Sequence, residues 1–258
     1  MMRTVSATRY VTPLREGGSL PAIVEADDLG LYVLKFRGAG QGPLALVAEW
    51  IAGEIGRALG LNVPELVRVE VDAVLGRNEA DSEIRELLHA SVGSNLGLDY
   101  LPGSATFDPA ADRVEPDLAS STVWFDAFVT NVDRTPRNPN LLWWHRSLYC
   151  IDHGAALYFH HNWQSREAMA GSRFPAIRDH VLLPWASRLE EADRRLRPRL
   201  DEGLFARLVE ELPADWLPAE AGLSHPAWRA GYVSFLTQRL AAAASFLEEA
   251  VRAQAQLV

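Results

Sequence analysis

Two short polar segments, separated by a largely apolar stretch, constrain the fold of this chain more than any other feature. The first, residues 131–138, follows residues 123–129, which are almost entirely apolar and therefore predict a buried helix. Proline at positions 136 and 139 prevents this segment from continuing that helix. The second, residues 150–154, ends an apolar strand at Asp152. The fold must therefore bring a polar loop and a carboxylate to the edge of a buried core.

The side chains in these segments are of the kinds that bind Mg²⁺, which prefers carboxylate and carbonyl oxygens. Asn138 follows Asp133 by five positions, a spacing that ordinary turns also contain. Asp152 is more telling, because a carboxylate at the rim of a core is costly unless it meets a metal or a cation. Together the three predict a phosphoryl-transfer site, with Asp133 as base and with Asn138 and Asp152 holding Mg²⁺ on ATP phosphates.

A lysine inside an otherwise apolar strand supports this hypothesis. Lys35 lies in residues 32–36, and such a lysine either reaches out to the strand edge or meets a buried anion. A helix is predicted from Pro43, and it carries Glu49, fourteen residues after Lys35. A strand lysine paired with a helix carboxylate is typical of kinases. Glu54 is the rival partner, but Glu49 fits better because it adjoins the apolar face of the helix.

Further residues are interpreted as phosphate contacts. Gly17, Gly18 and Ser19 join two predicted strands, and glycines let backbone amides approach a phosphate closely. Arg134 or Arg137 is expected to steady the transferred phosphoryl group, although a surface ion pair explains either arginine equally well. The chain contains no Walker A pattern, which disfavours the P-loop NTPases.

Composition is that of an ordinary globular protein, with 258 residues, 48% hydrophobic and 23% charged. The net charge of -9 argues against general nucleic-acid binding. Arg194, Arg195, Arg197 and Arg199 cluster, which we interpret as a solvated helix face, with a local basic patch as the alternative. The single cysteine, Cys150, can form no intrachain disulfide. Because neither a signal peptide nor a membrane span is recognisable, we expect a cytoplasmic protein.

The predicted elements change character along the chain. The first part is rich in strands, and residues 5–36 predict a three-stranded antiparallel meander. Residues 106–116 predict a loop, and from residue 117 helices dominate, apart from a hairpin at residues 141–151. The other predicted elements are a helix from residue 43, a strand at 63–71, a short helix at 79–90 and a strand with a connector at 93–103. This order predicts two parts with a nucleotide cleft between them.

Four stretches of the sequence resemble the HipA-like kinases, bacterial proteins with a protein-kinase-like fold. They are residues 32–36, 59–64, 131–138 and 151–154, and the resemblance extends over about residues 8–160. Within the family, the chain resembles the compact branch, whose members consist of the kinase alone. It implies an α+β, bilobal protein-kinase-like fold. A small antiparallel β-sheet N-lobe with one helix would comprise residues 1–101, and a larger, mainly α-helical C-lobe residues 102–258.

The same resemblance implies ATP and Mg²⁺ as cofactors and a serine or threonine hydroxyl on an unidentified protein as acceptor. It places Lys35 on the ATP phosphates and the residues named above as base and metal ligands. It also makes Asp99, Tyr100 and Leu101 the hinge whose backbone meets adenine. His153 departs from the pattern, because many kinases carry phenylalanine there.

Two alternatives to a protein kinase stay open. One is a pseudokinase that binds nucleotide or a partner without turnover. The other is a small-molecule phosphotransferase on the same fold, although such enzymes usually have His-Gly-Asp where this chain has Asn131, Val132 and Asp133.

Overall fold

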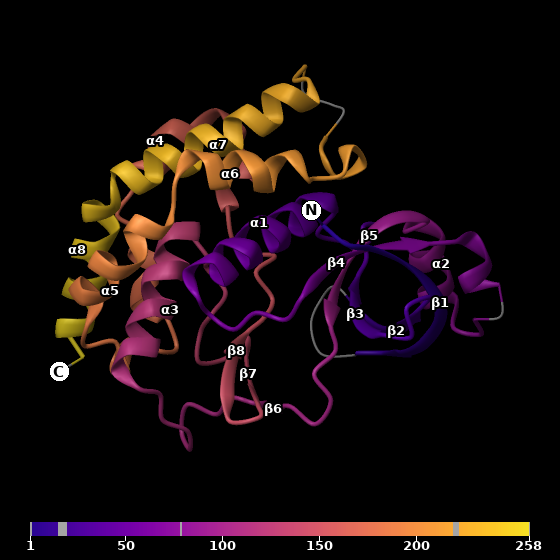
Figure 1. Ribbon diagram of the computed structural model, residues 1–258, viewed down its shortest axis with the longest axis horizontal. Helices are drawn as coiled ribbons and strands as arrows, with labels where there is room; N and C mark the ends of the chain where they lie inside the picture. Colours follow the sequence, from indigo (N-terminus) through magenta and orange to yellow (C-terminus); the bar gives the residue numbers. More distant parts are fainter. Residues whose placement is uncertain (1, 15–19, 78, 219–221, 258) are drawn as a thin grey trace.

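The fold combines a strand barrel with a larger helical part, and helix α1 lies between the two (Figure 1). This computed structural model describes residues 2–14, 20–77, 79–218 and 222–257. Gly17, Gly18 and Ser19, the predicted phosphate loop, lie outside the described residues. The mixed α/β content agrees with the prediction.

The barrel is built from β1 (Thr4–Pro13), β2 (Ala22–Ala26), β3 (Leu31–Lys35), β5 (Gly93–Asp99) and β4 (Leu66–Val71), in that order. The predicted meander of the first three strands is confirmed, because β2 pairs antiparallel with both of its neighbours. The expectation of a purely antiparallel sheet is wrong. β1 also pairs in parallel with β4, and this contact closes the sheet into a barrel.

The barrel encloses an apolar core of its own, because alternate residues of each strand point inward. Close packing is visible at Gly97, where a Cβ atom would lie 2.6 Å from Cγ2 of Val69. The strands approach one another here only because residue 97 has no side chain.

Helix α1 (Pro43–Leu59) begins at a proline and ends at Gly60, whose φ of 86° favours glycine. Most of the helix is buried, because it packs against β4 and β5 and against helix α6 of the helical part. Within α1, Trp50 Nε1 donates a hydrogen bond to the carbonyl of Leu208 (3.0 Å). The apolar residues of α1 therefore join the larger core and not that of the barrel.

The expectation of a single helix beside the barrel strands is wrong. The segment between β4 and β5 forms η1 (Ala73–Gly76) and α2 (Ser82–Ala90). The side chain of Asp81 caps α2 by accepting hydrogen bonds from the amides of Glu83 and Ile84. Ile84 then contributes to the barrel core, which explains why this connection folds as a helix.

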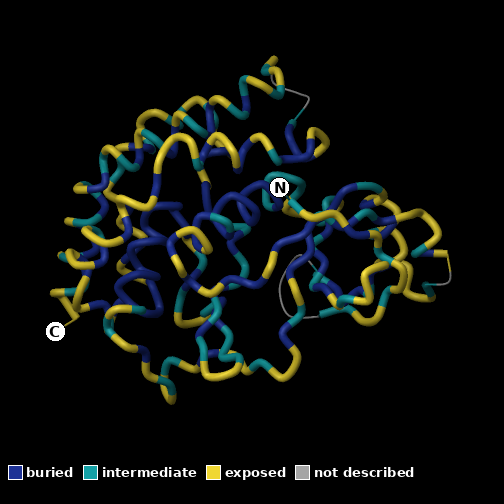
Figure 2. Tube along the Cα trace, in the orientation of Figure 1, coloured by how far each residue is buried: buried dark blue, intermediate teal, exposed yellow. Residues whose placement is uncertain are grey.

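The helical part is organised around α3 (Pro116–Val129), which is buried from Ala119 onward. The predicted hairpin forms as β7 (Leu141–Trp144) and β8 (Ser147–Cys150). A two-residue strand, β6 (Ala105–Thr106), pairs with β7, so the loop expected from residue 106 begins as a strand. Figure 2 shows the buried trace concentrated along α1 and α3.

The remaining elements are helical. Within the described residues, no helix combines the length and the apolar character needed to cross a bilayer. The α-helices are α4 (Arg166–Ala170), α5 (Leu189–Leu196), α6 (Glu202–Glu210), α7 (His225–Ala241) and α8 (Ala243–Ala255). The 3-10 helices are η2 (Tyr158–Ser165), η3 (Pro175–Asp179), η4 (Leu183–Trp185), η5 (Arg197–Arg199) and η6 (Ala214–Trp216). Of these elements, α5, α7, α8, η3 and η4 pack against α3.

Candidate active site

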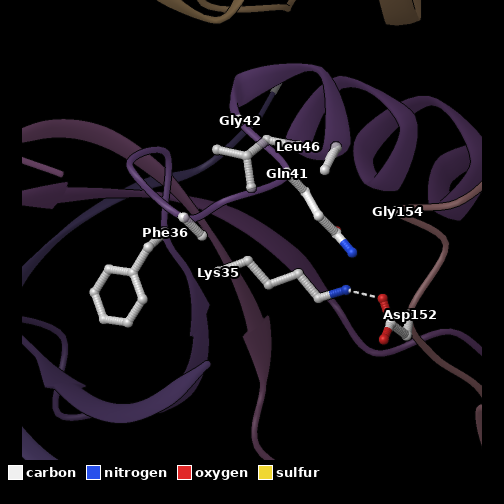
Figure 3. A pocket seen from close by; sticks show the side chains of 9 residues that line it. Lys35, Phe36, Gln41, Gly42, Leu46, Asp152 and Gly154 are labelled. Carbon is white, nitrogen blue, oxygen red and sulfur yellow. Dashed lines mark hydrogen bonds and ion pairs between the residues drawn. The ribbon is translucent and has the colours of Figure 1, made fainter. Parts of the chain in front are cut away.

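Three charged side chains from distant parts of the chain meet beside the barrel. Lys35 lies at the end of β3, Glu49 in α1 and Asp152 just after β8. The ammonium nitrogen of Lys35 is 2.5 Å from Glu49 Oε2 and 2.6 Å from Asp152 Oδ1, and Figure 3 shows Lys35 pointing at Asp152. Glu54, the rival partner in the sequence, instead pairs with Arg57 (3.2 Å).

The electrostatics of this triad follow from burial and charge. Burial alone disfavours the charged forms of Lys35 and Glu49. The two carboxylates outweigh burial and raise the pKa of Lys35, while Lys35 and His153 lower the pKa of Glu49 to about 2. Lys35 and Glu49 therefore stay charged across the neutral range, and Asp152 keeps a half-exposed side chain facing solvent.

This pairing predicts an acid-sensitive fold. The pKa of Glu49 is about 2 in the folded protein against an ordinary value of 4.5, so ionised Glu49 stabilises the fold above pH 4.5. That stabilisation is lost as the pH falls from 4.5 toward 2. We expect urea-unfolding midpoints to decrease over this interval, and less steeply in Glu49→Gln than in the wild type. Equal slopes in the two proteins would contradict the assignment.

His153 supports Glu49 from the other side. Its backbone amide donates to Glu49 Oε2 (2.7 Å), and its Nδ1 lies 3.3 Å from Glu49 Oε1. The ring is fully buried and packs edge-on against Phe125. His153, which stands where many kinases carry phenylalanine, thus connects the Glu49 carboxylate of α1 to the segment that carries Asp152.

The backbone at Asp152 is in the left-handed region, with φ of 55°. A residue other than glycine pays a conformational penalty there, and such residues concentrate at functional sites. This backbone conformation agrees with the functional role, as a ligand for Mg²⁺, that was predicted for Asp152 from its position at the end of an apolar strand.

The loop after α3 brings Asp133 and Asn138 together. Asn138 Nδ2 donates to Asp133 Oδ2 (2.7 Å), and Asn140 Nδ2 lies 3.4 Å from the same oxygen. Burial and the neighbouring charge of Asp152 raise the pKa of Asp133 above its ordinary value, although both amide bonds oppose this. Asp133 and Asp152 are therefore close enough for their charges to repel, and a cation between them would relieve that repulsion.

Arg134 does not face this site, which rules out one of the two predicted phosphoryl contacts. It is buried, its Nε is 2.6 Å from Asp126 Oδ2, and His180 Nε2 is 2.8 Å from the same oxygen. The Arg134 guanidinium also donates to the carbonyls of Asn140 and Ile151. One buried arginine thus ties the loop that carries Asp133 to the residue before Asp152. Arg137 is exposed, and its role stays a prediction.

A small hollow opens beside Lys35 and Asp152, between the barrel and the start of α1 (Figure 3). Its other lining residues include Phe36, Gln41 and Gly42, and the Gln41 amide points toward the Lys35 ammonium in Figure 3. Sequence reasoning missed this loop. The alternating glycines at positions 38, 40 and 42, directly after Lys35, were the signal that would have identified it.

The predicted hinge begins at Asp99, the last residue of β5. The amides of Asp99 and Tyr100 donate to the carbonyls of Glu65 and Leu31 (both 2.9 Å), so both donors are used within the barrel. Leu101 is buried, and its carbonyl accepts a hydrogen bond from the amide of Ser104. An adenine contact by these residues stays a prediction, and of the three amides that of Leu101 is the best candidate donor.

The residues present fit a magnesium ion bound together with phosphates. Because its nitrogen donates to Asp133, the Asn138 amide keeps its oxygen available, and Asp152 offers a half-exposed carboxylate. Mg²⁺ in such sites uses one or two carboxylates and takes its other ligands from phosphates and water. Among the described residues, no group of three or more His, Cys, Asp or Glu side chains is placed to hold a metal ion.

Comparison with solved structures places this fold in the class of kinase-like folds. A proinflammatory kinase of Helicobacter pylori, CtkA, matches with a TM-score of 0.52 at 14% identity, covering 92% of this chain and 94% of that one. The Golgi casein kinase matches with a TM-score of 0.51 at 14% identity, covering 96% and 72%. Its complex with Mn and ADP gives a TM-score of 0.50 at 13% identity, covering 96% and 73%.

The family is narrower than the fold class. The model of the HipA-like kinases matches residues 8–243, so this chain belongs to the HipA-like kinase family. The match extends well beyond the region in which the sequence resemblance was recognised. A search of the curated proteins finds no match.

Proposed function

We propose that this protein is an ATP- and Mg²⁺-dependent kinase that phosphorylates a serine or threonine hydroxyl of a protein acceptor. The observation that carries the proposal is the placement of Lys35 between Glu49 and Asp152, with Asp133 within electrostatic range of Asp152. Family membership supports phosphate transfer, and the Golgi casein kinase complex supports the use of a nucleotide with a divalent metal.

We further propose two lobes, residues 1–101 and 102–258, with the nucleotide between them. The separate apolar core of the barrel supports this division. Helix α1 belongs to the first lobe by sequence but shares the core of the second. Helix α1, which carries Glu49, would therefore stay packed against the second lobe and lie between the two lobes.

In the proposed mechanism Asn138 and Asp152 would hold the metal ion, which when bound would supply positive charge to neutralise the phosphates. Lys35 contacts phosphate oxygens while Glu49 keeps its ammonium in place. Asp133 accepts the proton of the acceptor hydroxyl, a task that its raised pKa suits. Asn138 orients the Asp133 carboxylate through the bond from Nδ2.

Nucleotide binding is testable by thermal unfolding. We expect saturating ATP with Mg²⁺ to raise the melting temperature of the wild type by about 5 °C, since a ligand at a hundred times its Kd stabilises by roughly 2.7 kcal/mol. ATP without Mg²⁺ should raise it less, and Asp152→Asn should show no Mg²⁺-dependent part. Asp215→Asn, in an exposed ion pair with Arg37, is the control and should behave as the wild type.

The outcomes separate the competing hypotheses. A wild type that ATP does not stabilise would contradict the proposal. Stabilisation without transfer from labelled ATP to any acceptor would identify a pseudokinase. Transfer to aminoglycosides or sugars, with none to lysate proteins or to the chain itself, would identify a small-molecule phosphotransferase.

A further inference from the structure

The buried carboxylate of Asp126 connects α3 to two other segments, the loop that carries Asp133 and the segment that carries His180. The Asp126 side chain is fully buried near the end of α3. Its Oδ2 atom lies 2.8 Å from Nε2 of His180, which is 54 residues further along the chain. The proposed mechanism assigns no role to His180, although a buried polar contact of this kind is kept only where each group has its partner.

The tautomer of His180 follows from its two hydrogen bonds. The backbone amide of Leu182 donates to Nδ1 (3.0 Å), so Nδ1 is an acceptor and carries no proton. Burial lowers the pKa of His180 below its ordinary value, although the neighbouring Asp126 carboxylate acts in the opposite direction. The neutral ring therefore carries its proton on Nε2, from which it donates a hydrogen bond to Asp126.

From Asp126 the hydrogen bonds continue to the backbone of Asp133. Asn131 Nδ2 donates to Asp126 Oδ1 (2.9 Å), which fixes the orientation of the Asn131 amide group. Asn131 Oδ1 in turn accepts a hydrogen bond from the backbone amide of Asp133 (3.2 Å). The backbone of Asp133 is therefore held by a series of hydrogen bonds that begins at His180.

A second connection between the same two segments uses the main chain. The amide of Val181 donates to the carbonyl of Arg134 (3.0 Å), the residue directly after Asp133. Arg134 Nε also donates to Asp126 Oδ2 (2.6 Å), the oxygen that His180 contacts. The segment at residues 180–182 is thus bonded to the loop both through its main chain and through the His180 side chain.

We propose that His180 is a positioning residue for phosphate transfer. It orients the backbone that carries the Asp133 carboxylate, and it acts through Asp126 and Asn131. This role rests on the proposed function, in which Asp133 accepts the proton of the acceptor hydroxyl. Such a base must lie within hydrogen-bond reach of that proton, and a misplacement of about 1 Å can lower the rate by roughly a hundred-fold.

Two variants separate the hydrogen bond of His180 from the volume of its ring. His180→Gln keeps a side-chain N–H near the position of Nε2, whereas His180→Leu keeps a similar size and removes the donor. At saturating ATP, we expect transfer from labelled ATP to lysate proteins or to the chain itself to fall about a hundred-fold in His180→Leu. In His180→Gln it should fall less than about ten-fold, and KM for ATP should be unchanged in both variants. Rates are expressed per folded molecule, with the folded fraction measured by circular dichroism.

Hydrogen exchange supplies a readout that does not depend on activity. The Asp133 amide is protected by its bond to Asn131 Oδ1, so NMR should show it exchanging about ten-fold faster in His180→Leu than in the wild type or in His180→Gln. The matched control is His160→Leu, because His160 is also buried and its Nδ1 lies 3.1 Å from the Tyr232 hydroxyl. This control should lose stability but keep the wild-type rate per folded molecule and the wild-type exchange at Asp133.

The outcomes distinguish the role of His180 from the proposed function. Unchanged exchange at Asp133 in His180→Leu would overturn the positioning role. Equal losses of transfer in His180→Leu and His180→Gln, or an equal loss in His160→Leu, would also overturn it, because packing alone would then explain the effect. A wild type that transfers no phosphate would instead contradict the proposed function.

Discussion

Replacing Lys35 with methionine is expected to lower phosphate transfer by about a thousand-fold, the effect of removing a preorganised group that stabilises transition-state charge. The structure explains the size of this effect, because Lys35 lies between Glu49 and Asp152 at 2.5 and 2.6 Å. Without its ammonium, the two carboxylates would lose their common partner and the phosphates would lose a counter-charge.

Lys35→Arg is the more informative variant, because Lys35 is the only lysine in a chain with 24 arginines. The guanidinium keeps the charge, but it is larger and planar and does not fit between the same two carboxylates. We expect transfer to fall by about a hundred-fold while ATP still raises the melting temperature. Arg37→Lys, the reverse exchange in an exposed ion pair, is the control. Normal activity of Lys35→Arg would show that only charge is needed at this position.

The second large effect is expected on stability. Replacing Asp126 with asparagine should lower the free energy of unfolding by about 3–5 kcal/mol, the usual cost of leaving one member of a buried ion pair without its partner. Asp126 is fully buried and contacts Arg134, His180 and Asn131 at 2.6, 2.8 and 2.9 Å. Arg134 would remain charged in the core without a carboxylate beside it.

Urea unfolding followed by circular dichroism measures this loss. Asp179→Asn, in the exposed pair with Arg178, is the matched control and should change stability by less than about 1 kcal/mol. A loss in Asp126→Asn no larger than in the control would show that the buried network contributes little. Because Arg134 also bonds the carbonyl of Ile151 (3.2 Å), we expect phosphate transfer to fall in Asp126→Asn even where the protein remains folded.

Local patterns predicted the elements well. The helix from Pro43, the buried helix before Thr130 and the hairpin around residues 144–147 all follow from side-chain periodicity and from proline and glycine positions. The second helix beside the barrel was visible as a short pattern but was not counted in the predicted architecture. The parallel contact between β1 and β4 joins residues more than sixty positions apart, and no local pattern encodes it.

The order of chemical groups was also readable from the sequence. Lys35, Asp133 and Asp152 stand at strand ends and in a loop, where a charged group needs a partner, and this need is a property of each local segment. The family of the chain was recognisable from the same segments. The family model matches residues 8–243, a longer region than the one over which the resemblance was recognised in the sequence.

Tertiary structure alone decided what each of these groups contacts. It made Arg134 a buried connector and not a phosphate ligand, and it brought the amide of His153 to Glu49 across 104 residues. It also placed His180 beside Asp126, 54 residues away in the chain. Sequence determined which segments carry charge and where helices and strands begin. Which side chains a charged group contacts depends on how elements distant in the chain pack together. That packing is set by the apolar surface buried over the whole core.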